Sequence, residues 1–366
     1  MSAPSSIAAL GSSYAAGPGV PPVEDVAAMR SGANYAHLLA ERLGARLTDL
    51  TVSGATTGTI LDTPQTAWNG VSIPPQIDGL PADAELVTIT AGGNDLGFIG
   101  ATMSAAARAA GPDSEVAALL AAMARGSVGD AAGDIADGGA AESSDGPSAS
   151  GDGTASRGAD AAPALPPVPV PTDDDVDRAA AGLARVVDAV RDRAPRARVL
   201  LVDYLSLLGP GTTPEAASVS APDLDALRTV QAALESAFAR AAERSGVELV
   251  AVSALSSEHA LGSAEPWVTG LVPTRRGLAG SYHPNAVGMR AVADALAAVL
   301  GRGRTARPAC RTPAGAPPRH DGARPRPEGD LRPSAGRRGT EPCRRPFLGA
   351  WDAPREPIPG TVTTHS

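Results

Sequence analysis

Short apolar runs alternate along the chain with longer stretches whose apolar positions recur at helical spacing. The short runs predict five strands, at residues 7–10, 46–52, 85–90, 197–204 and 247–252. The longer stretches predict helices at residues 34–43, 100–125, 173–193, 223–244 and 285–300. Strands that alternate with helices are typical of an α/β fold with a parallel, doubly wound sheet. We therefore expect that architecture.

Two segments lack this pattern, at about residues 126–171 and at 302–366. The first consists of Gly, Ala, Ser, Asp and Pro with hardly a large apolar side chain, and the second is rich in Arg, Pro and Gly. Such segments bury too little apolar surface to offset their ordering entropy, so we expect both to be disordered. The prediction is one folded domain over 1–301, interrupted at about 126–171, followed by a tail. A basic interaction arm is the alternative for the tail.

Charge and cysteine content indicate which partners and which cellular compartment to expect. The net charge is -9, and thirteen arginines after residue 301 make the folded part still more acidic, so we expect no nucleic-acid partner. Both cysteines lie in the tail, which fits a reducing compartment. No run of about 18 apolar residues and no leader pattern is visible, so we expect no stable membrane insertion and a cytoplasmic location. A misassigned start site would leave secretion open.

Loops of small residues follow the first three predicted strands. They are Gly11-Ser12-Ser13-Tyr14, Ser53-Gly54-Ala55-Thr56-Thr57-Gly58 and Gly92-Gly93-Asn94-Asp95. The carboxyl ends of parallel strands meet at one edge of a sheet, where α/β folds bind their ligands. These loops therefore predict one composite site. Neither glycine pattern of the nucleotide-binding loops fits them, and we expect no cofactor.

The chain has five histidines, and one of them is placed for catalysis. His283 lies directly before Pro284 and the last predicted helix, a rigid position from which an imidazole can act as a base. His37 falls within a predicted helix, where a structural role is expected, and His259 lies in a polar loop. The histidines and cysteines show no metal-ligand spacing, so no metal site is predicted.

These motifs resemble the blocks of the SGNH/GDSL hydrolase superfamily. The matching residues are Gly11 to Tyr14, Gly54, Gly92 to Asp95, and His283-Pro284-Asn285. The loop from Gly11 to Gly19 and the stretch Pro266-Trp267-Val268 are similar to the actinobacterial esterase and lipase branch. The resemblance implies a three-layer α/β/α domain with a flavodoxin-like, five-stranded parallel sheet, extending over residues 1–301.

The resemblance also implies a reaction, the hydrolysis of an acyl (carboxylic) ester by a serine esterase or lipase. Ser13 would be the nucleophile and His283 its base. The backbone N–H groups of Ser13 and Gly54 and the side-chain amide of Asn94 would form the oxyanion hole. A small-molecule ester is the expected substrate, and we expect a monomer.

The chain departs from the family pattern at two positions. Ser12 replaces the aspartate of the first block, so Ser12 remains an alternative nucleophile. Gly280 stands where an aspartate usually orients the histidine, three residues before it. We expect the carbonyl of Gly280 to accept the imidazole N–H, giving a catalytic dyad, with Glu258 or Glu265 as alternative partners. These departures also allow a second hypothesis, a catalytically silent protein that binds an ester or carbohydrate.

Overall fold

The computed structural model describes residues 3–124, 165 and 167–302. The chain divides into two compact units, Met1–Pro308 and Ala309–Ser366, and only the first contains described residues. The predicted disordered insertion lies outside the described residues except for 165 and 167–171, and the predicted tail lies outside them from residue 303 onward. The fold below is therefore that of the first unit.

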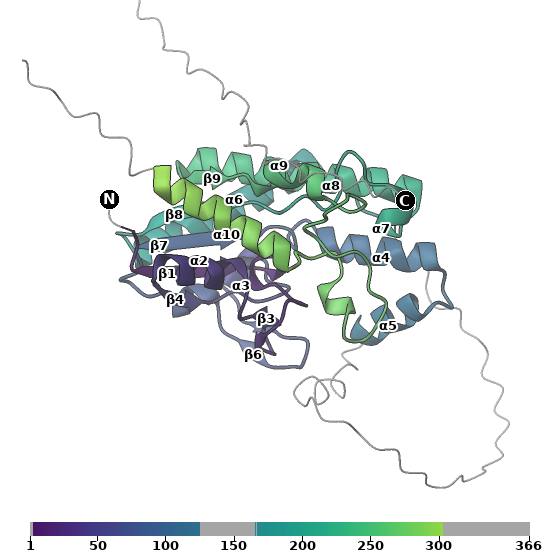
Figure 1. The fold of residues 1–366 in the computed structure, drawn as a ribbon, viewed down its shortest axis with the longest axis horizontal. Helices are drawn as coiled ribbons and strands as arrows, with labels where there is room; N and C mark the ends of the chain where they lie inside the picture. The colour runs from purple at the N-terminus through teal and green to yellow at the C-terminus, as the bar shows by residue number, and fades with distance from the viewer. Residues whose placement is uncertain (1–2, 125–164, 166, 303–366) are drawn as a thin grey trace, which may run out of the picture. The chain divides into compact units, whose positions relative to one another are not determined.

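A five-stranded parallel sheet forms the centre of this unit (Figure 1). Its strands are β1 (Ser6–Gly11), β4 (Arg46–Asp49), β7 (Leu86–Thr90), β8 (Arg198–Val202) and β9 (Glu248–Val250), in the order β4-β1-β7-β8-β9. Numbered by their appearance in the chain, these strands have the flavodoxin-like order 2-1-3-4-5. The predicted fold class is confirmed. The order reverses between β1 and β7, which is the edge position where such sheets bind ligands.

Four long helices cover the two faces of the sheet (Figure 1). Helices α2 (Tyr35–Leu43) and α10 (Ala286–Arg302) pack together on one face, and α6 (Asp173–Arg193) packs against α8 (Ala221–Ser245) on the other. Every residue of β1 and β7 is buried, as expected for central strands covered on both faces.

Local sequence signals explain where these helices begin. The Asn34 side chain accepts hydrogen bonds from the Ala36 and His37 N–H groups at the start of α2. Thr172 and Asp175 form a reciprocal capping box at the start of α6. Along α6, residues at helical spacing are buried against the sheet, while three aspartates occupy its first turn, where the helix dipole favours negative charge.

The structure corrects one predicted helix and adds short elements that the pattern did not reveal. The stretch 100–125 forms two helices, because Gly111 and Pro112 separate them. The two helices are α4 (Phe98–Ala110) and α5 (Glu115–Ala124). The short elements are α1 (Ser13–Ala16), β2 (Val23–Asp25), β3 (Arg30–Ser31), α3 (Thr57–Leu61), β5 (Gln65–Thr66), β6 (Ser72–Ile73), α7 (Pro214–Ala217), α9 (Val252–Ser256), and 3-10 turns at Gln76–Gly79, Ser257–His259 and Leu278–Gly280.

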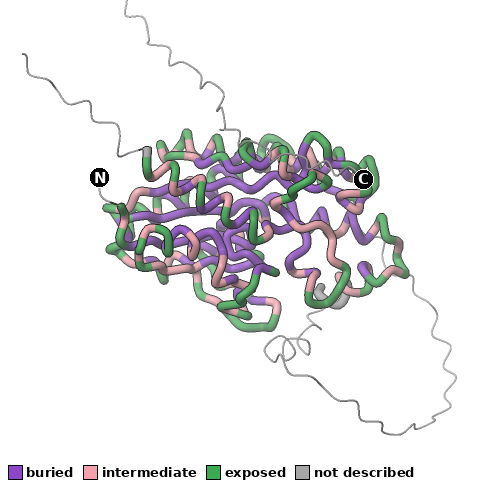
Figure 2. Tube along the Cα trace, viewed as in Figure 1, coloured by how far each residue is buried: buried purple, intermediate pink, exposed green. Residues whose placement is uncertain are grey.

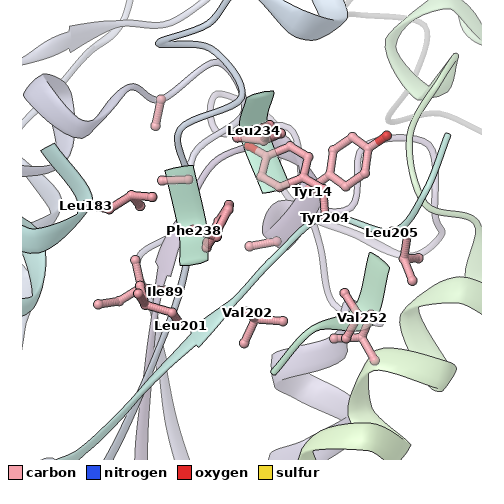
Figure 3. Packing of buried hydrophobic residues seen from close by; sticks show 14 of the residues in the cluster. Tyr14, Ile89, Leu183, Leu201, Val202, Tyr204, Leu205, Leu234, Phe238 and Val252 are labelled. Atoms are coloured by element: carbon pink, nitrogen blue, oxygen red, sulfur yellow. The ribbon is translucent and has the colours of Figure 1, made fainter. Parts of the chain in front are cut away.

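Burial follows the strands and the inner faces of the helices (Figure 2). Apolar side chains from β7, β8, α6 and α8 meet next to two stacked tyrosines, Tyr14 and Tyr204 (Figure 3). The core therefore continues up to the carboxyl edge of the sheet. Among the described helices, none is long and apolar enough to span a membrane.

Candidate active site

Ser13 lies at the carboxyl end of β1, in the first turn of the short helix α1. The preceding residue is held to the neighbouring strand, since the Ser12 N–H donates to the Thr90 carbonyl at 2.8 Å. Helix α1 then ends at Gly17, whose φ of 76° lies in the left-handed region. The Ser13 residue is only 6% exposed. The loop thus fixes a serine hydroxyl at the edge of the sheet.

His283 completes a serine–histidine pair. Its Nε2 lies 2.8 Å from Ser13 Oγ, and its Nδ1 lies 2.7 Å from the carbonyl oxygen of Ser281. A carbonyl only accepts hydrogen bonds, so Nδ1 carries the proton and Nε2 accepts the one from the Ser13 hydroxyl. The two residues predicted as nucleophile and base are therefore in hydrogen-bond contact, with the base in the tautomer that can take the serine proton.

The orienting carbonyl is that of Ser281, and the prediction of Gly280 was wrong. The Gly280 carbonyl instead accepts the backbone N–H of His283 at 3.3 Å. Glu258 and Glu265 are exposed at the surface, and Nδ1 is already bonded to Ser281. Gly280 packs against the backbone after α1, where an added Cβ would lie 3.1 Å from the Gly19 Cα. An aspartate is therefore poorly accommodated at that position.

Two tyrosines hold the turn that presents the Ser281 carbonyl. Tyr282 has a φ of 61°, a left-handed conformation that is unusual for a bulky side chain. The Tyr14 hydroxyl donates to the Tyr282 carbonyl at 3.0 Å, and the Tyr282 hydroxyl donates to the Ala217 carbonyl at 2.9 Å. Tyr14, the residue next to Ser13, thus fixes the loop that carries His283.

Burial determines the protonation state of the base. Desolvation lowers the pKa of His283 to about 4, and the hydrogen bond to the Ser281 carbonyl opposes that shift. The imidazole is then neutral at physiological pH and available to accept a proton. The hydrogen bond to a carbonyl supplies orientation without a full negative charge.

The other predicted site residues lie on the two neighbouring loops. Gly54 follows β4 with a φ of 85°, a conformation that favours glycine. The Asn94 amide donates to the Ala55 carbonyl at 2.9 Å, which links the loop after β7 to the Gly54 loop. Among the described residues, the N–H groups of Ser13 and Gly54 have no hydrogen-bond acceptor. Both donors are thus available to a ligand.

Ser12 has a different environment from Ser13. Its side chain is fully buried, and its Oγ lies 2.6 Å from the hydroxyl of Tyr204. That hydroxyl also accepts the Gly93 N–H at 3.2 Å. A Cβ at Gly93 would lie 2.7 Å from the Tyr204 ring, so this close approach requires glycine. Ser13 contacts His283, whereas Ser12 contacts Tyr204, which links two loops in a way that sequence reasoning missed.

Asp95 supports the same edge in a way that sequence reasoning also missed. Its carboxylate accepts the N–H of Thr57 at 3.2 Å and the hydroxyl of Thr57 at 2.5 Å. Thr57 is the first residue of α3, so the carboxylate satisfies an N–H group that the helix leaves free. The sequence shows an aspartate directly after Asn94, but it does not show that Thr57 is the residue this aspartate binds.

A group of potential metal ligands lies at a different place, where β2, α2 and β4 meet. Glu24, His37 and Asp49 each present a ligand atom, and the three atoms lie within 4.8 Å of one another. The sequence predicted no metal site, because residues this far apart show no ligand spacing.

Comparison with known proteins agrees with the geometry. The model of the GDSL-like Lipase/Acylhydrolase family matches residues 9–291. Lipase 2 from Streptomyces coelicolor is 34% identical over 312 residues, which cover 80% of this chain and 85% of that protein. The range matched by the family model contains Ser13, Gly54, Asn94 and His283.

Two solved structures share the fold. The extracellular lipase from Streptomyces rimosus aligns with a TM-score of 0.52 and 23% identity, over 80% of this chain and 98% of that one. Phospholipase A1 from Streptomyces albidoflavus NA297 aligns with a TM-score of 0.54 and 20% identity, over 81% and 99% of the two chains. Taken with the family match and the 34% identical relative, this chain belongs to the GDSL-like lipase/acylhydrolase family and is an ester hydrolase.

Proposed function

We propose that the protein hydrolyses carboxylic esters of apolar acyl chains through an acyl-enzyme on Ser13. The observation that carries this proposal is the 2.8 Å hydrogen bond between Ser13 Oγ and Nε2 of a buried, neutral His283. A nucleophile in contact with a base, and a base oriented by a third group, is the arrangement used by serine hydrolases on many folds.

In the first half of the reaction, Ser13 Oγ attacks the ester carbonyl carbon while its proton moves to His283 Nε2. The tetrahedral intermediate collapses, the ester C–O bond breaks, and the leaving alcohol takes the proton from Nε2. In the second half, water attacks the acyl-enzyme, gives a proton to Nε2, and the carboxylic acid leaves as the proton returns to Ser13. The Ser281 carbonyl holds Nδ1–H throughout and so keeps the ring aligned.

The negative charge of the intermediate needs donors at the sheet edge. Ser13 and Gly54 lie on the loops that follow the adjacent strands β1 and β4, and the Asn94 amide donates to the Ala55 carbonyl. We assign these three donors to the oxyanion hole. Loss of one such donor typically lowers the rate by about 10²–10³-fold.

A cavity of about 230 Å³, four to seven residues along the chain from Ser13 where it begins, is our candidate for an acyl-chain site. It is bounded by the backbone that follows α1 and by the β2–β3 hairpin, and three arginines also line it. Its walls are Gly17, Pro18, Gly19, Val20, Val23, Val26, Met29, Arg30, Ser31, Trp68, Arg275, Arg276 and Ala279. Apolar walls favour a hydrocarbon chain over a sugar, whose hydroxyls would lose hydrogen bonds to water there.

The test is hydrolysis of a series of p-nitrophenyl esters, from acetate to palmitate, by the wild type and by Ser13→Ala. We expect turnover that is faster on acyl chains longer than acetyl and a loss of at least about 10³-fold in the variant. Ser12→Ala is the matched comparison, because it removes a neighbouring hydroxyl that contacts Tyr204 and leaves the nucleophile in place.

A serine-reactive fluorophosphonate separates the two serines directly. It should label the wild type and Ser12→Ala, and it should not label Ser13→Ala. A wild type that binds long-chain esters without hydrolysing them would instead support the catalytically silent binding protein.

A further inference from the structure

The group of Glu24, His37 and Asp49 lies where three elements of the fold meet. Glu24 is on β2, His37 is on α2, and Asp49 is the last residue of β4. Nε2 of His37 lies 3.1 Å from a Glu24 carboxylate oxygen. Its Nδ1 lies 3.1 Å from the Asn34 amide oxygen and 3.5 Å from an Asp49 carboxylate oxygen. An imidazole and two carboxylates are ligand types that first-row divalent ions accept together.

The Asp49 carboxylate is held in a fixed orientation. Its side chain is only 4% exposed, and one of its oxygens accepts the N–H and the hydroxyl of Thr51 at 3.0 and 2.6 Å. The other oxygen, which faces His37, accepts the Asn34 amide at 2.7 Å. Hydrogen bonds of this kind orient the carboxylates of metal sites, and a buried carboxylate needs such compensation.

The local charge favours a dication. Glu24, Asp25 and Asp49 bring three negative charges to this corner, and Arg30 brings one positive charge. The Arg30 guanidinium pairs with Asp25 at 3.2 Å and donates to the Thr51 carbonyl at 2.8 Å, and its Nε lies farther, at 3.6 Å, from the Glu24 carboxylate. Three carboxylates against one guanidinium leave two negative charges at this corner, and one divalent ion offsets both.

The corner is also accessible to an ion. The His37 side chain is 24% exposed and that of Glu24 is 47% exposed, so a hydrated ion reaches both without opening the core. Glu24 is the middle residue of the exposed strand β2. Water completes the coordination on the open side.

We propose that His37, Glu24 and Asp49 bind one divalent first-row transition-metal ion, with Zn²⁺ as the representative. The ion ties the β2–β3 hairpin to α2 and β4, because its three ligands come from these elements. Its role is structural, and it is independent of the acyl chemistry at Ser13.

The test measures Zn²⁺ binding by isothermal titration calorimetry on the chelator-treated full chain. Cys310 and Cys343 are replaced by serine in every sample, because cysteine thiolates would bind zinc elsewhere. We expect one ion per chain at this site and a rise of the melting temperature of about 5 °C at saturating zinc. Mg²⁺ and Ca²⁺ should bind much more weakly, since they prefer all-oxygen sites.

Three variants and one control locate the ion. Glu24→Gln and His37→Gln should each weaken binding by more than about tenfold. Asp49→Asn serves as a third variant; because Asp49 is nearly buried, the exposed Glu24 keeps the test decisive if that variant does not fold. His259→Gln is the control, since His259 is stacked on Trp267 at 4.0 Å and should leave zinc binding unchanged.

Absence of zinc binding in the wild type overturns the proposal, as does unchanged affinity in Glu24→Gln and His37→Gln. The Ser13→Ala variant should bind zinc as the wild type does. That result separates the two proposals, because a failure of the serine mechanism leaves this measurement unaffected.

Discussion

Two histidines of this chain have opposite surroundings. His283 is buried beside Ser13, and its Nδ1 donates to a neutral backbone carbonyl. His37 is partly exposed and lies between the carboxylates of Glu24 and Asp49. Burial without a nearby negative charge keeps an imidazole neutral and able to take a proton, whereas carboxylates around a ring favour positive charge beside them.

The two histidines also differ in the kinds of groups that surround them. The surroundings of His283 are hydroxyls, carbonyls and tyrosine rings, including the stacked pair Tyr14 and Tyr204 (Figure 3). The surroundings of His37 are charged groups near the surface. Salt screens exposed charges and affects buried neutral hydrogen bonds much less. What each imidazole can do is therefore decided by the groups that surround it.

The largest expected effect comes from removal of the buried histidine. His283→Gln keeps a polar side chain of similar length but cannot take up the Ser13 proton, and we expect kcat to fall by about 10²–10⁴-fold. Steady-state kinetics on the preferred p-nitrophenyl ester measure this loss. The His259→Gln variant should retain activity, because the His259 ring stacks on Trp267.

Zinc binding by His283→Gln tests whether the two histidines act independently. The variant should bind zinc with wild-type affinity, because the two histidines serve different regions. A variant that retains wild-type kcat would contradict the assignment of His283 as the base.

A smaller effect is expected from Tyr204→Phe. The variant removes the hydroxyl that joins Ser12 to the Gly93 N–H and leaves that buried N–H without its partner. Such a loss costs about 1–3 kcal/mol. That cost is one of folding stability. We expect kcat to fall by roughly tenfold with little change in KM for a separate reason, because loss of the link displaces the two loops from the catalytic geometry.

The melting temperature and the pH profile separate positioning from simple destabilisation in this variant. If Tyr204 positions the two loops, kcat falls at temperatures well below unfolding while the acid limb of the profile stays where it is. A lower melting temperature with unchanged kcat would show that the tyrosine acts on stability alone.

The central fold was predictable because its signals are local. The apolar runs of β1 and β7 are buried along their whole length, and their pattern therefore indicates strands directly. The hairpins β2–β3 and β5–β6 consist of strands of two or three residues, too short for a periodic pattern. Their existence depends on contacts with the folded domain.

Those parts of the candidate site that consist of single residues in short sequence motifs were predictable. Ser13 and His283 stand in short motifs, whereas the Ser281 carbonyl reaches Nδ1 only because Tyr282 adopts a left-handed conformation. A tyrosine gives no sign of that conformation in the sequence. The group of Glu24, His37 and Asp49 likewise forms only when three elements come together.

The smallest effects are those of pH, and they test whether burial governs the catalytic histidine. The pKa of His283 is lowered to about 4, so kcat/KM should fall on the acid side with a midpoint near pH 4. Measurement of kcat/KM from pH 3.5 to 8 locates this midpoint. A midpoint near 6.5, the ordinary histidine value, would show that the ring is solvated.

Stability carries a second signature, in which two buried groups act in opposite directions. Between pH 6.5 and 4 the unfolded chain protonates His283 first, so this group lowers stability as pH falls. Burial raises the pKa of Asp203 to about 6, although Ser253 donates to its carboxylate. Between pH 6 and 3.8 the native state protonates Asp203 first, so this group raises stability as pH falls.

Asp203→Asn separates the two contributions. An asparagine can keep both hydrogen bonds with Ser253 and removes the buried charge, so the variant should be more stable than the wild type at pH 7 and similar to it near pH 4. Its stability should therefore fall more steeply on acidification, as His283 alone dictates. Melting temperatures at pH 7 and pH 4.5 measure the difference. If the melting temperature falls by the same amount between pH 7 and pH 4.5 in the variant and in the wild type, Asp203 does not titrate in this range. The acid limb of kcat/KM should be the same in both proteins, because Asp203 bonds to Ser253 and not to Ser13 or His283.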